Sequence, residues 1–250
     1  MSVFISLSLL AGFASTVSAI TGVAGGVLLL SGLVLCVPAT AVVPIHGLVQ
    51  FTAGASRMLA FRRHIQWSVV SPFLLTMIPG ACMGAYGLSY LYALNPSWLL
   101  VVIALVIALT LRPRTNTEQI QHTSNKSLTG LSILGFSCGV LGMFVGSTGP
   151  LVSGWLLNHG ILKEEHIASK SVMQGCAHLV KIPLFTLGLD FDFTPYTHPL
   201  IGMILMVFVG TWFGKWCLTR VSKRSFAVMT QCILVIIIVK IFITELPKLL

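Results

Sequence analysis

Amide and cationic side chains recur in this chain at a constant separation, with an imidazole paired with a cation at a third position. A shift of 124 residues relates one set to the other, and the six residues are His46, Gln50, Arg57, Lys170, Gln174 and Lys181. At 100° per residue, the three positions of each set fall within one broad face of a helix. Amides with a cation on either side would attract an oxyanion. In a membrane such groups are costly unless they line protein or water, so we expect these six residues to bind an anion.

A glycine-rich break precedes each set, and the same shift carries Gly22 to Gly146. Such sequences interrupt helices, and a helix that starts after the break presents unpaired N–H groups and the positive end of its dipole. An anion is the natural partner of such a helix end. The donors expected at the two breaks are Thr21, Gly25, Gly26, Ser147, Thr148 and Gly149.

The composition places most of the chain in lipid. Of its 250 residues 56% are hydrophobic and only 8% are charged, far below the ~25% charged residues of soluble domains. The formal net charge of +9 does not indicate a nucleic-acid partner, because Lys and Arg are neither dense nor interleaved with aromatic residues. Basic loops that face anionic lipid explain most of this charge. We therefore predict an integral protein of the plasma (inner) membrane.

Eight apolar blocks follow one another, at about residues 3–37, 40–61, 66–93, 97–111, 128–158, 166–187, 196–218 and 225–244. A helix needs ~20 residues to span ~30 Å of hydrocarbon, so we interpret six blocks as single spans. The blocks at 3–37 and 128–158 are longer and contain the two breaks. Each is predicted to form a re-entrant-like hairpin of two half-helices, with one long tilted helix as the alternative.

Loop charge distinguishes these alternatives, since cytoplasmic loops collect Lys and Arg. With two hairpins, one side of the membrane receives nine cations, namely Arg62, Arg63, Arg112, Arg114, Lys126, Lys163, Arg220, Lys223 and Arg224. With eight simple spans, the same cations divide between both sides. We therefore predict an all-α polytopic fold of two inverted repeats, each a broken hairpin plus three transmembrane helices, with both termini extracellular or periplasmic. The repeats are 1–112 and 128–250, joined by a cytoplasmic linker at 113–127.

The six acidic residues all fall in loops or near block ends, and they are Glu118, Glu164, Glu165, Asp190, Asp192 and Glu245. No buried carboxylate is then available to hold a metal or relay protons, so we expect no metal, no cofactor and no cation cargo. Proton coupling would have to use His46 and His178 or the substrate, while hydrogen-bonded packing is the alternative for each His. Catalysis is not expected, because no base is placed with Ser147.

Structural roles are the alternatives for the candidate site. The glycines would then serve close helix packing, and Gln50 and Gln174 would form interhelical hydrogen bonds. Arg57 and Lys181 would reach toward the membrane surface. For the whole protein, an anion channel or a membrane scaffold is the alternative; saturable counter-transport would favour a carrier and unsaturated currents a channel. A coupling proton or counter-ion, and a homodimer, are partners that the sequence leaves open.

The first break, the Pro and small-residue helix that follow it, and the basic turn Arg63-His64-Ile65-Gln66-Trp67 resemble the sulfite exporter TauE/SafE family. The duplicated hydrophobic architecture resembles these proteins, also called toluene-sulfonate uptake permeases, from end to end. The resemblance implies a secondary transporter, working by alternating access, for sulfite, sulfoacetate or another organosulfonate. A small carboxylate or another oxyanion is the alternative cargo, because Gly-Val-Ala-Gly-Gly and Ile45-His46-Gly47 depart from the family pattern at the expected site.

Overall fold

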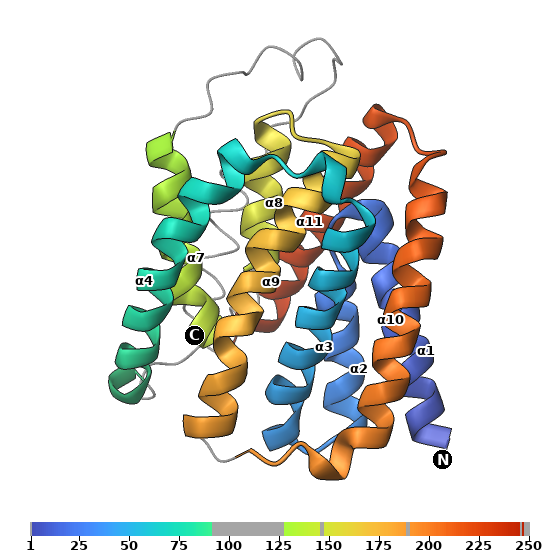
Figure 1. Ribbon diagram of the computed structural model, residues 1–250, viewed down its shortest axis with the longest axis vertical. Coiled ribbons are helices and arrows are strands. Elements are labelled where there is room, and N and C mark those ends of the chain that lie inside the picture. The colour runs from blue at the N-terminus through green and yellow to red at the C-terminus, as the bar shows by residue number, and fades with distance from the viewer. Residues whose placement is uncertain (1, 92–127, 146–147, 189–190, 246, 248–250) are drawn as a thin grey trace. The chain divides into compact units, whose positions relative to one another are not determined.

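The computed structural model describes residues 2–91, 128–145, 148–188, 191–245 and 247 (Figure 1). Within these residues all regular structure is helical, and the helices are α1 (Ser2–Thr21), α2 (Gly25–Cys36), α3 (Ala39–Ala60), η1 (Arg62–His64), α4 (Trp67–Leu91), α7 (Leu128–Val145), α8 (Gly149–Asn158), α9 (Lys163–Gly188), η2 (Thr194–Tyr196), α10 (Thr197–Leu218) and α11 (Lys223–Glu245). The predicted span at 97–111 and the predicted linker at 113–127 lie outside the described residues.

Four of the described helical segments are long and apolar enough to cross a membrane, namely Phe4–Thr21, Trp67–Gly84, Thr194–Leu218 and Lys223–Thr244. The all-helical class is confirmed for the described residues, and these helices are consistent with a polytopic membrane protein. Helices α3 and α9 do not belong to this apolar set. Both carry amide and cationic side chains along their length, and such helices must face protein or water.

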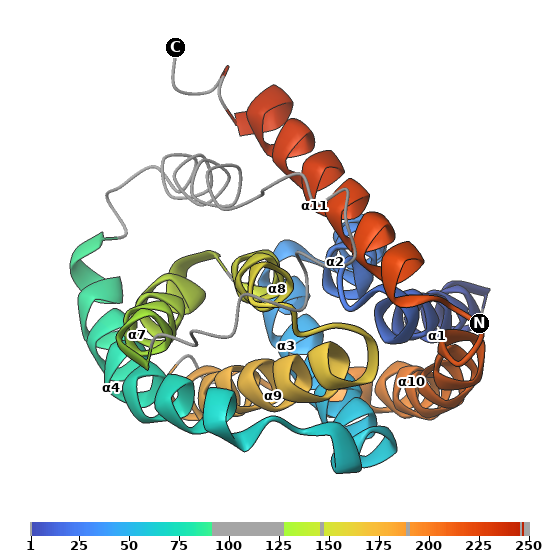
Figure 2. The same ribbon diagram turned by 90° about the horizontal axis from the view of Figure 1, so that it is seen from above.

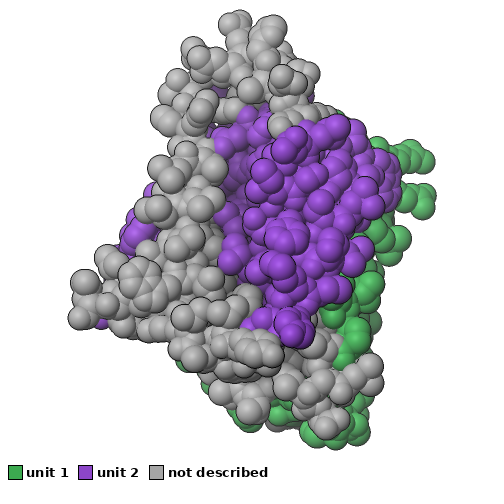
Figure 3. Space-filling model, turned by 90° about the vertical axis from the view of Figure 1, so that its left-hand side faces the viewer, with its two compact units in different colours: residues 1–65, 163–222 green, residues 66–162, 223–250 purple. Residues whose placement is uncertain are grey.

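The chain divides into two compact units, which Figure 3 distinguishes by colour. Unit 1 comprises residues 1–65 and 163–222, and unit 2 comprises residues 66–162 and 223–250. Each unit therefore combines segments from both halves of the sequence.

In unit 1, α1 and α10 lie side by side (Figures 1 and 2). Gly12 packs against Met206, and the Thr16 hydroxyl lies 3.1 Å from the Gly210 carbonyl oxygen, to which it can donate. The residue numbers rise together along both helices, so the pair is parallel. A Cβ atom at Gly210 would overlap the backbone of Gly12. Small residues of this kind let membrane helices approach closely.

In unit 2, α4 and α7 form the same kind of parallel pair. Gly80 packs against the backbone of Phe136, and Gly84 packs against that of Val140. A Cβ atom at Gly84 would lie 2.8 Å from the Val140 carbonyl oxygen. This pair therefore also depends on glycine at its contact surface.

The two helix pairs have equivalent registers. A shift of 124 residues carries the contact positions of α1 onto those of α7, and a shift of 126 residues carries those of α4 onto those of α10. The equivalent contacts are Gly12–Met206 with Phe136–Gly80, and Thr16–Gly210 with Val140–Gly84. The internal packing of the two pairs thus has the correspondence that a duplicated sequence predicts.

This equivalence leads to a matched pair of expected results. Gly84→Leu and Gly210→Leu should each destabilise the protein by overpacking, by about 1–3 kcal/mol, because each new side chain meets the backbone of the partner helix. Thermal unfolding of the purified protein in detergent measures the loss. Val209→Leu, at an exposed position of α10, is the control and should leave the unfolding temperature unchanged. A loss in only one glycine variant would contradict the equivalence.

The long apolar block at the start of the sequence forms two antiparallel helices. Helix α1 ends at Thr21 and α2 begins at Gly25, and the chain turns through Gly22 at φ 72° and Ala24 at φ 70°. Left-handed backbone interrupts a helix, and glycine adopts it without strain. Helix α2 then returns along α1, with Gly25 packed against Ser18. The second long block is likewise divided, into α7 and α8.

Helices α3 and α9 of unit 1 cross in opposite directions (Figure 1). Gly54 and Gly175 meet at the crossing, where a Cβ atom at Gly54 would lie 3.1 Å from the Gly175 Cα atom. Arg57, which follows Gly54 on α3, contacts Ser171, which precedes Gly175 on α9. These are the two helices that the 124-residue shift relates to each other, so the related helices pack antiparallel.

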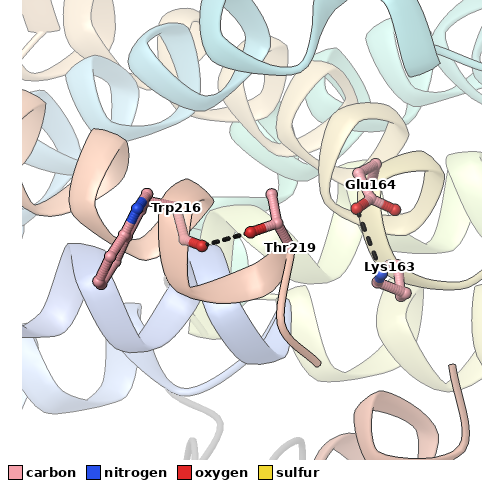
Figure 4. Close-up of polar contacts among 4 residues, drawn as sticks. All are labelled: Lys163, Glu164, Trp216 and Thr219. Carbon is pink, nitrogen blue, oxygen red and sulfur yellow. Dashed lines mark hydrogen bonds and ion pairs between the residues drawn. The ribbon is translucent and has the colours of Figure 1, made fainter. Parts of the chain in front are cut away.

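Unit 1 has a basic end, where α3 and α10 finish. The Lys215 ammonium donates to the Ala60 carbonyl at 2.6 Å, which holds the last turns of these two helices together. Two local contacts lie at the adjoining helix ends (Figure 4), from Thr219 Oγ1 to Trp216 O at 2.7 Å and from Lys163 Nζ to Glu164 Oε1 at 3.4 Å.

The opposite end of unit 1 carries Asp192, in the segment between α9 and η2. The side chain and the backbone N–H of Thr194 bond to its carboxylate, the N–H at 2.8 Å, and these bonds lower the pKa of Asp192. The carboxylate therefore stays charged at neutral pH. Because α1 is parallel to α10, α1 begins at this acidic end and finishes toward the basic one.

Candidate anion-binding site

A small cavity lies beside the break between α1 and α2. Its volume is about 10 Å³, room for about one water molecule. The lining residues come from α1, the break, α3 and α9, and they are Ser18, Gly22, Arg57, Ile167, Lys170, Ser171 and Gln174. Three residues expected from the sequence therefore meet at one place, namely Arg57, Lys170 and Gln174.

Two buried cations dominate this cavity, since Arg57 and Lys170 retain only 6% and 5% of their full exposure. Arg57 Nε donates to the Ser171 hydroxyl at 3.3 Å, and that hydroxyl donates to the Ile167 carbonyl at 2.6 Å. The Lys170 ammonium donates to the Gly22 carbonyl just past the C-terminal end of α1. A cation is favourable there because the last carbonyls of a helix form the negative end of its dipole.

Neither cation has an acidic partner in the described part of the chain. The ion pair found there joins Lys163 to Glu164, whereas Arg57 and Lys170 repel each other. Taking an uncompensated ion out of water costs several kcal/mol. An anion bound between the two cations would offset that cost.

A second group of expected residues surrounds the start of α2. His46 Nε2 contacts the Gly26 carbonyl oxygen at 3.0 Å, and because a carbonyl only accepts, this nitrogen carries the proton. The Gln50 amide lies against Gly26, whose ideal Cβ position is 3.6 Å from Gln50 Cδ. The rings of His46 and His178 meet edge to face, with 6.0 Å between the ring centroids. Helix α3 thus contacts the α2 side of the break through the His46 imidazole. Helix α9 contacts the α1 side through the Lys170 ammonium.

The break also uses polar groups of its own. The Thr21 hydroxyl lies 2.8 Å from the Val17 carbonyl and 3.0 Å from the Val23 carbonyl, and it accepts the Val23 N–H at 3.3 Å. The Gly25 N–H donates to the Val23 carbonyl at 2.9 Å. Thr21 and Gly25 therefore close the turn, and α2 starts without a side-chain cap.

The remaining expected residues are Ser147, Thr148, Gly149 and Lys181. Thr148 is buried in unit 2 and precedes α8, which begins at Gly149 without a side-chain cap. Lys181 belongs to α9, but its side chain lies outside the described part of the structure. Ser147 also lies outside the described residues.

Four lining residues were not selected from the sequence, namely Ser18, Gly22, Ile167 and Ser171. Helical periodicity could have found two of them, because Ser171 lies three residues before Gln174 and one turn after Ile167 on the same face. Gly22 belongs to the repeat pattern, but N–H donors were expected at the break, whereas the Gly22 carbonyl accepts a hydrogen bond from Lys170. Ser18 gives no sequence signal, since hydroxyl residues are common along α1.

Among the described residues, Arg57 and Lys170 are thus buried cations without an acidic partner, in a chain with helices long and apolar enough to cross a membrane. Ionisable groups buried in membrane proteins commonly mark functional sites. A family model described as "Sulfite exporter TauE/SafE" matches residues 7–241. The chain belongs to the TauE/SafE family. The match covers nearly the whole chain and confirms the resemblance seen in the sequence. Comparisons with curated proteins and with solved structures found no match.

Family membership and the apolar helices together make this chain a multi-pass membrane protein of a transporter family rather than an enzyme family. The family description names sulfite, a small oxyanion. Guanidinium, ammonium, amide and hydroxyl groups are the donors that proteins use to bind such oxyanions. All four groups line the cavity beside the first break.

Proposed function

We propose that this protein is a secondary transporter of a small sulfur-containing anion, such as sulfite, sulfoacetate or another organosulfonate, in the plasma membrane. The observation that carries the proposal is the pair of buried cations, Arg57 and Lys170, without an acidic partner among the described residues. The transported anion supplies the missing negative charge. Gln174 and Ser18 provide neutral donors beside it.

The donor geometry suits an oxyanion better than a spherical anion. A guanidinium group presents paired N–H donors that match two oxygens of a sulfite or sulfonate group, while an ammonium acts as a point charge. Each charge-assisted hydrogen bond contributes about 1.5–3 kcal/mol. These contributions offset the desolvation of the ligand and of the two cations.

The size of the cavity favours a carrier over an open channel. A volume of about 10 Å³ accommodates one water molecule but no sulfonate. The anion therefore enters only when the surrounding helices rearrange, whereas a channel keeps a continuous path. We assign this structure to a contracted form of the site, which must widen during an alternating-access cycle.

Two packing features support inverted halves. The related helices α3 and α9 run antiparallel, and the pairs α1–α10 and α4–α7 have equivalent registers. Inverted repeats give a transporter two access states through exchange of conformations between its halves. Under this proposal the basic end of unit 1 faces the cytoplasm, as the positive-inside rule favours, and the start of α1 faces the extracellular or periplasmic side.

Under the same proposal the second repeat contributes to the site as the first one does. The repeats at 1–112 and 128–250 move relative to each other, and the cytoplasmic linker at 113–127 joins them. A coupling proton would use His46 and His178. The donors from the second repeat are Ser147, Thr148, Gly149 and Lys181.

A ligand screen by thermal unfolding tests the cargo class. Sulfite or sulfoacetate should raise the unfolding temperature, since a ligand that binds only the folded state adds about 2.7 kcal/mol at 100 times its Kd. Sulfate, thiosulfate and zwitterionic taurine define the charge and shape that the site accepts. A larger shift with carboxylates than with every sulfur anion would reassign the cargo.

Flux measurements on Gln50→Ala and Gln174→Ala test the position of the site. Each variant should weaken anion binding about 2- to 12-fold, as expected for one neutral hydrogen bond of about 0.5–1.5 kcal/mol. Saturable counterflow of labelled sulfite in proteoliposomes gives the affinity. Gln231→Ala on α11 is the control, because Gln231 is not among the donors assigned to the site. Unchanged binding and flux in both test variants would show that the site lies elsewhere. Unsaturated currents would indicate a channel rather than a carrier.

A further inference from the structure

A larger pocket lies at the basic end of unit 1, where η1 follows α3 and where α10 ends. Its volume is about 440 Å³, within the range of about 300–1,000 Å³ that is usual for ligand sites. Its lining combines cations with apolar side chains, namely Leu59, Arg62, Arg63, His64, Trp212 and Lys215. None of these residues lines the small cavity beside the break.

The cations of this pocket are arranged to receive an anionic group. The Lys215 ammonium is fixed by the Ala60 carbonyl at 2.6 Å and lies 5.1 Å from the ring centre of Trp212. Arg62 and Arg63 are exposed, and neither forms an ion pair in the described part of the chain. The pocket therefore presents three positive charges and no described counter-charge.

Apolar side chains beside the pocket are exposed on the same helices. Leu59 and Trp212 are each 54% exposed, and Trp216 on the next turn of α10 is 55% exposed. Since α10 lies within a membrane-spanning candidate segment that ends at Leu218, these side chains are placed to contact lipid. Tryptophan near the end of a span lies at the level of the lipid headgroups. The pocket thus combines positive charge with an apolar wall at headgroup depth.

We propose that this pocket binds an anionic phospholipid. The headgroup phosphate contacts Arg62, Arg63 and Lys215, and the acyl chains follow the exposed apolar face of α10. Basic pockets between transmembrane helices are suited to acidic lipid headgroups. A soluble anion such as phosphate would satisfy the cations but leave Leu59 and Trp212 uncovered, whereas a lipid covers both parts of the pocket.

Quenching of tryptophan fluorescence by brominated lipids tests this site. The full-length protein is reconstituted in phosphatidylcholine nanodiscs that contain a small fraction of brominated phosphatidylglycerol or, in parallel, of brominated phosphatidylcholine. We expect a preference for phosphatidylglycerol of roughly tenfold or more, which falls toward one in the Arg62→Gln/Arg63→Gln double variant. Because both arginines are exposed, this variant should keep its fold, and its unfolding temperature checks that point.

Matched variants separate the pocket from the rest of the basic surface. Trp212→Phe should reduce the excess quenching by phosphatidylglycerol and leave only the part that arises from Trp216 on the next turn, whereas Trp67→Phe, at another exposed tryptophan outside the pocket, should retain all of it. Arg224→Gln should keep the lipid preference. Equal quenching by both lipids in the wild type, or a full preference in the double variant, would overturn the proposal. Displacement of the lipid by equimolar soluble glycerol phosphate would overturn it in favour of a soluble anion.

Discussion

Replacing Arg57 with Gln should remove most of the anion binding while leaving the anion-free protein at least as stable as the wild type. Loss of the guanidinium removes charge-assisted hydrogen bonds to the ligand, each worth about 1.5–3 kcal/mol, and weakens binding about 10- to 150-fold. In the anion-free protein the same change removes a buried, uncompensated charge and its repulsion of Lys170, both of which are favourable changes.

Thermal unfolding with and without sulfite measures both effects in one experiment. At 100 times the wild-type Kd, sulfite should stabilise the wild type by about 2.7 kcal/mol. A variant with 100-fold weaker binding should gain only about 0.4 kcal/mol at the same concentration. Proteoliposome uptake of labelled sulfite should fall in parallel.

Lys170→Gln is the matched comparison, and its anion-free protein should change in the opposite direction. This variant also removes a cation from the cavity, but it breaks the bond to the Gly22 carbonyl past the end of α1. Loss of that bond removes a buried, charge-assisted hydrogen bond between α9 and the end of α1, which destabilises the fold. If Arg57→Gln were instead the destabilised variant and kept the full response to sulfite, Arg57 would have a structural role.

Replacing Gly54 with Leu should disable the anion site without changing any of its polar side chains. A Cβ atom at Gly54 would lie 3.1 Å from Gly175 Cα and 3.3 Å from the Ser171 carbonyl oxygen. Backbone atoms cannot move aside as a flexible side chain can, so α3 and α9 must separate. We expect a loss of about 1–3 kcal/mol from overpacking, together with loss of sulfite binding, because Arg57 and Lys170 lie on different helices.

The control for this change is Leu59→Met on the same helix. Leu59 is 54% exposed and does not line the small cavity, so an exchange between two apolar side chains of similar volume is tolerated there. Unfolding temperature and sulfite binding should both stay close to those of the wild type. Retained binding in Gly54→Leu, despite a lower unfolding temperature, would show that the close crossing of α3 and α9 does not position the site.

The helical layout was largely predictable because it depends on local properties of the chain. Apolar length predicted spans at 66–93 and 196–218, close to the bounds of α4 and α10. The first break was predictable because left-handed backbone at Gly22 ends a helix whatever packs around it. Which helices pair was not predictable, because small residues that permit close packing occur throughout a chain with 23 glycines.

The residue types of the candidate site were predictable from the sequence, but the hydrogen-bond partners of these residues were not. Cations and amides are rare in this apolar chain, so Arg57, Lys170 and Gln174 stood out, and the structure brings them to one cavity. Their individual bonds depend on how closely separate helices approach. The contact of His46 with the Gly26 carbonyl is an example, since those residues belong to different helices and share no sequence pattern.

The pairing of α1 with α10 also determines an order of events during synthesis. The Ser15 hydroxyl donates at 3.0 Å to the Val207 carbonyl, which lies 192 residues further along the chain. At about 5–20 residues per second, the ribosome needs roughly 10–40 s to reach that partner. Until then the hydroxyl and glycine surface of α1 must be sheltered by lipid or by the insertion machinery. The first helix therefore enters the membrane early and acquires its native neighbour late.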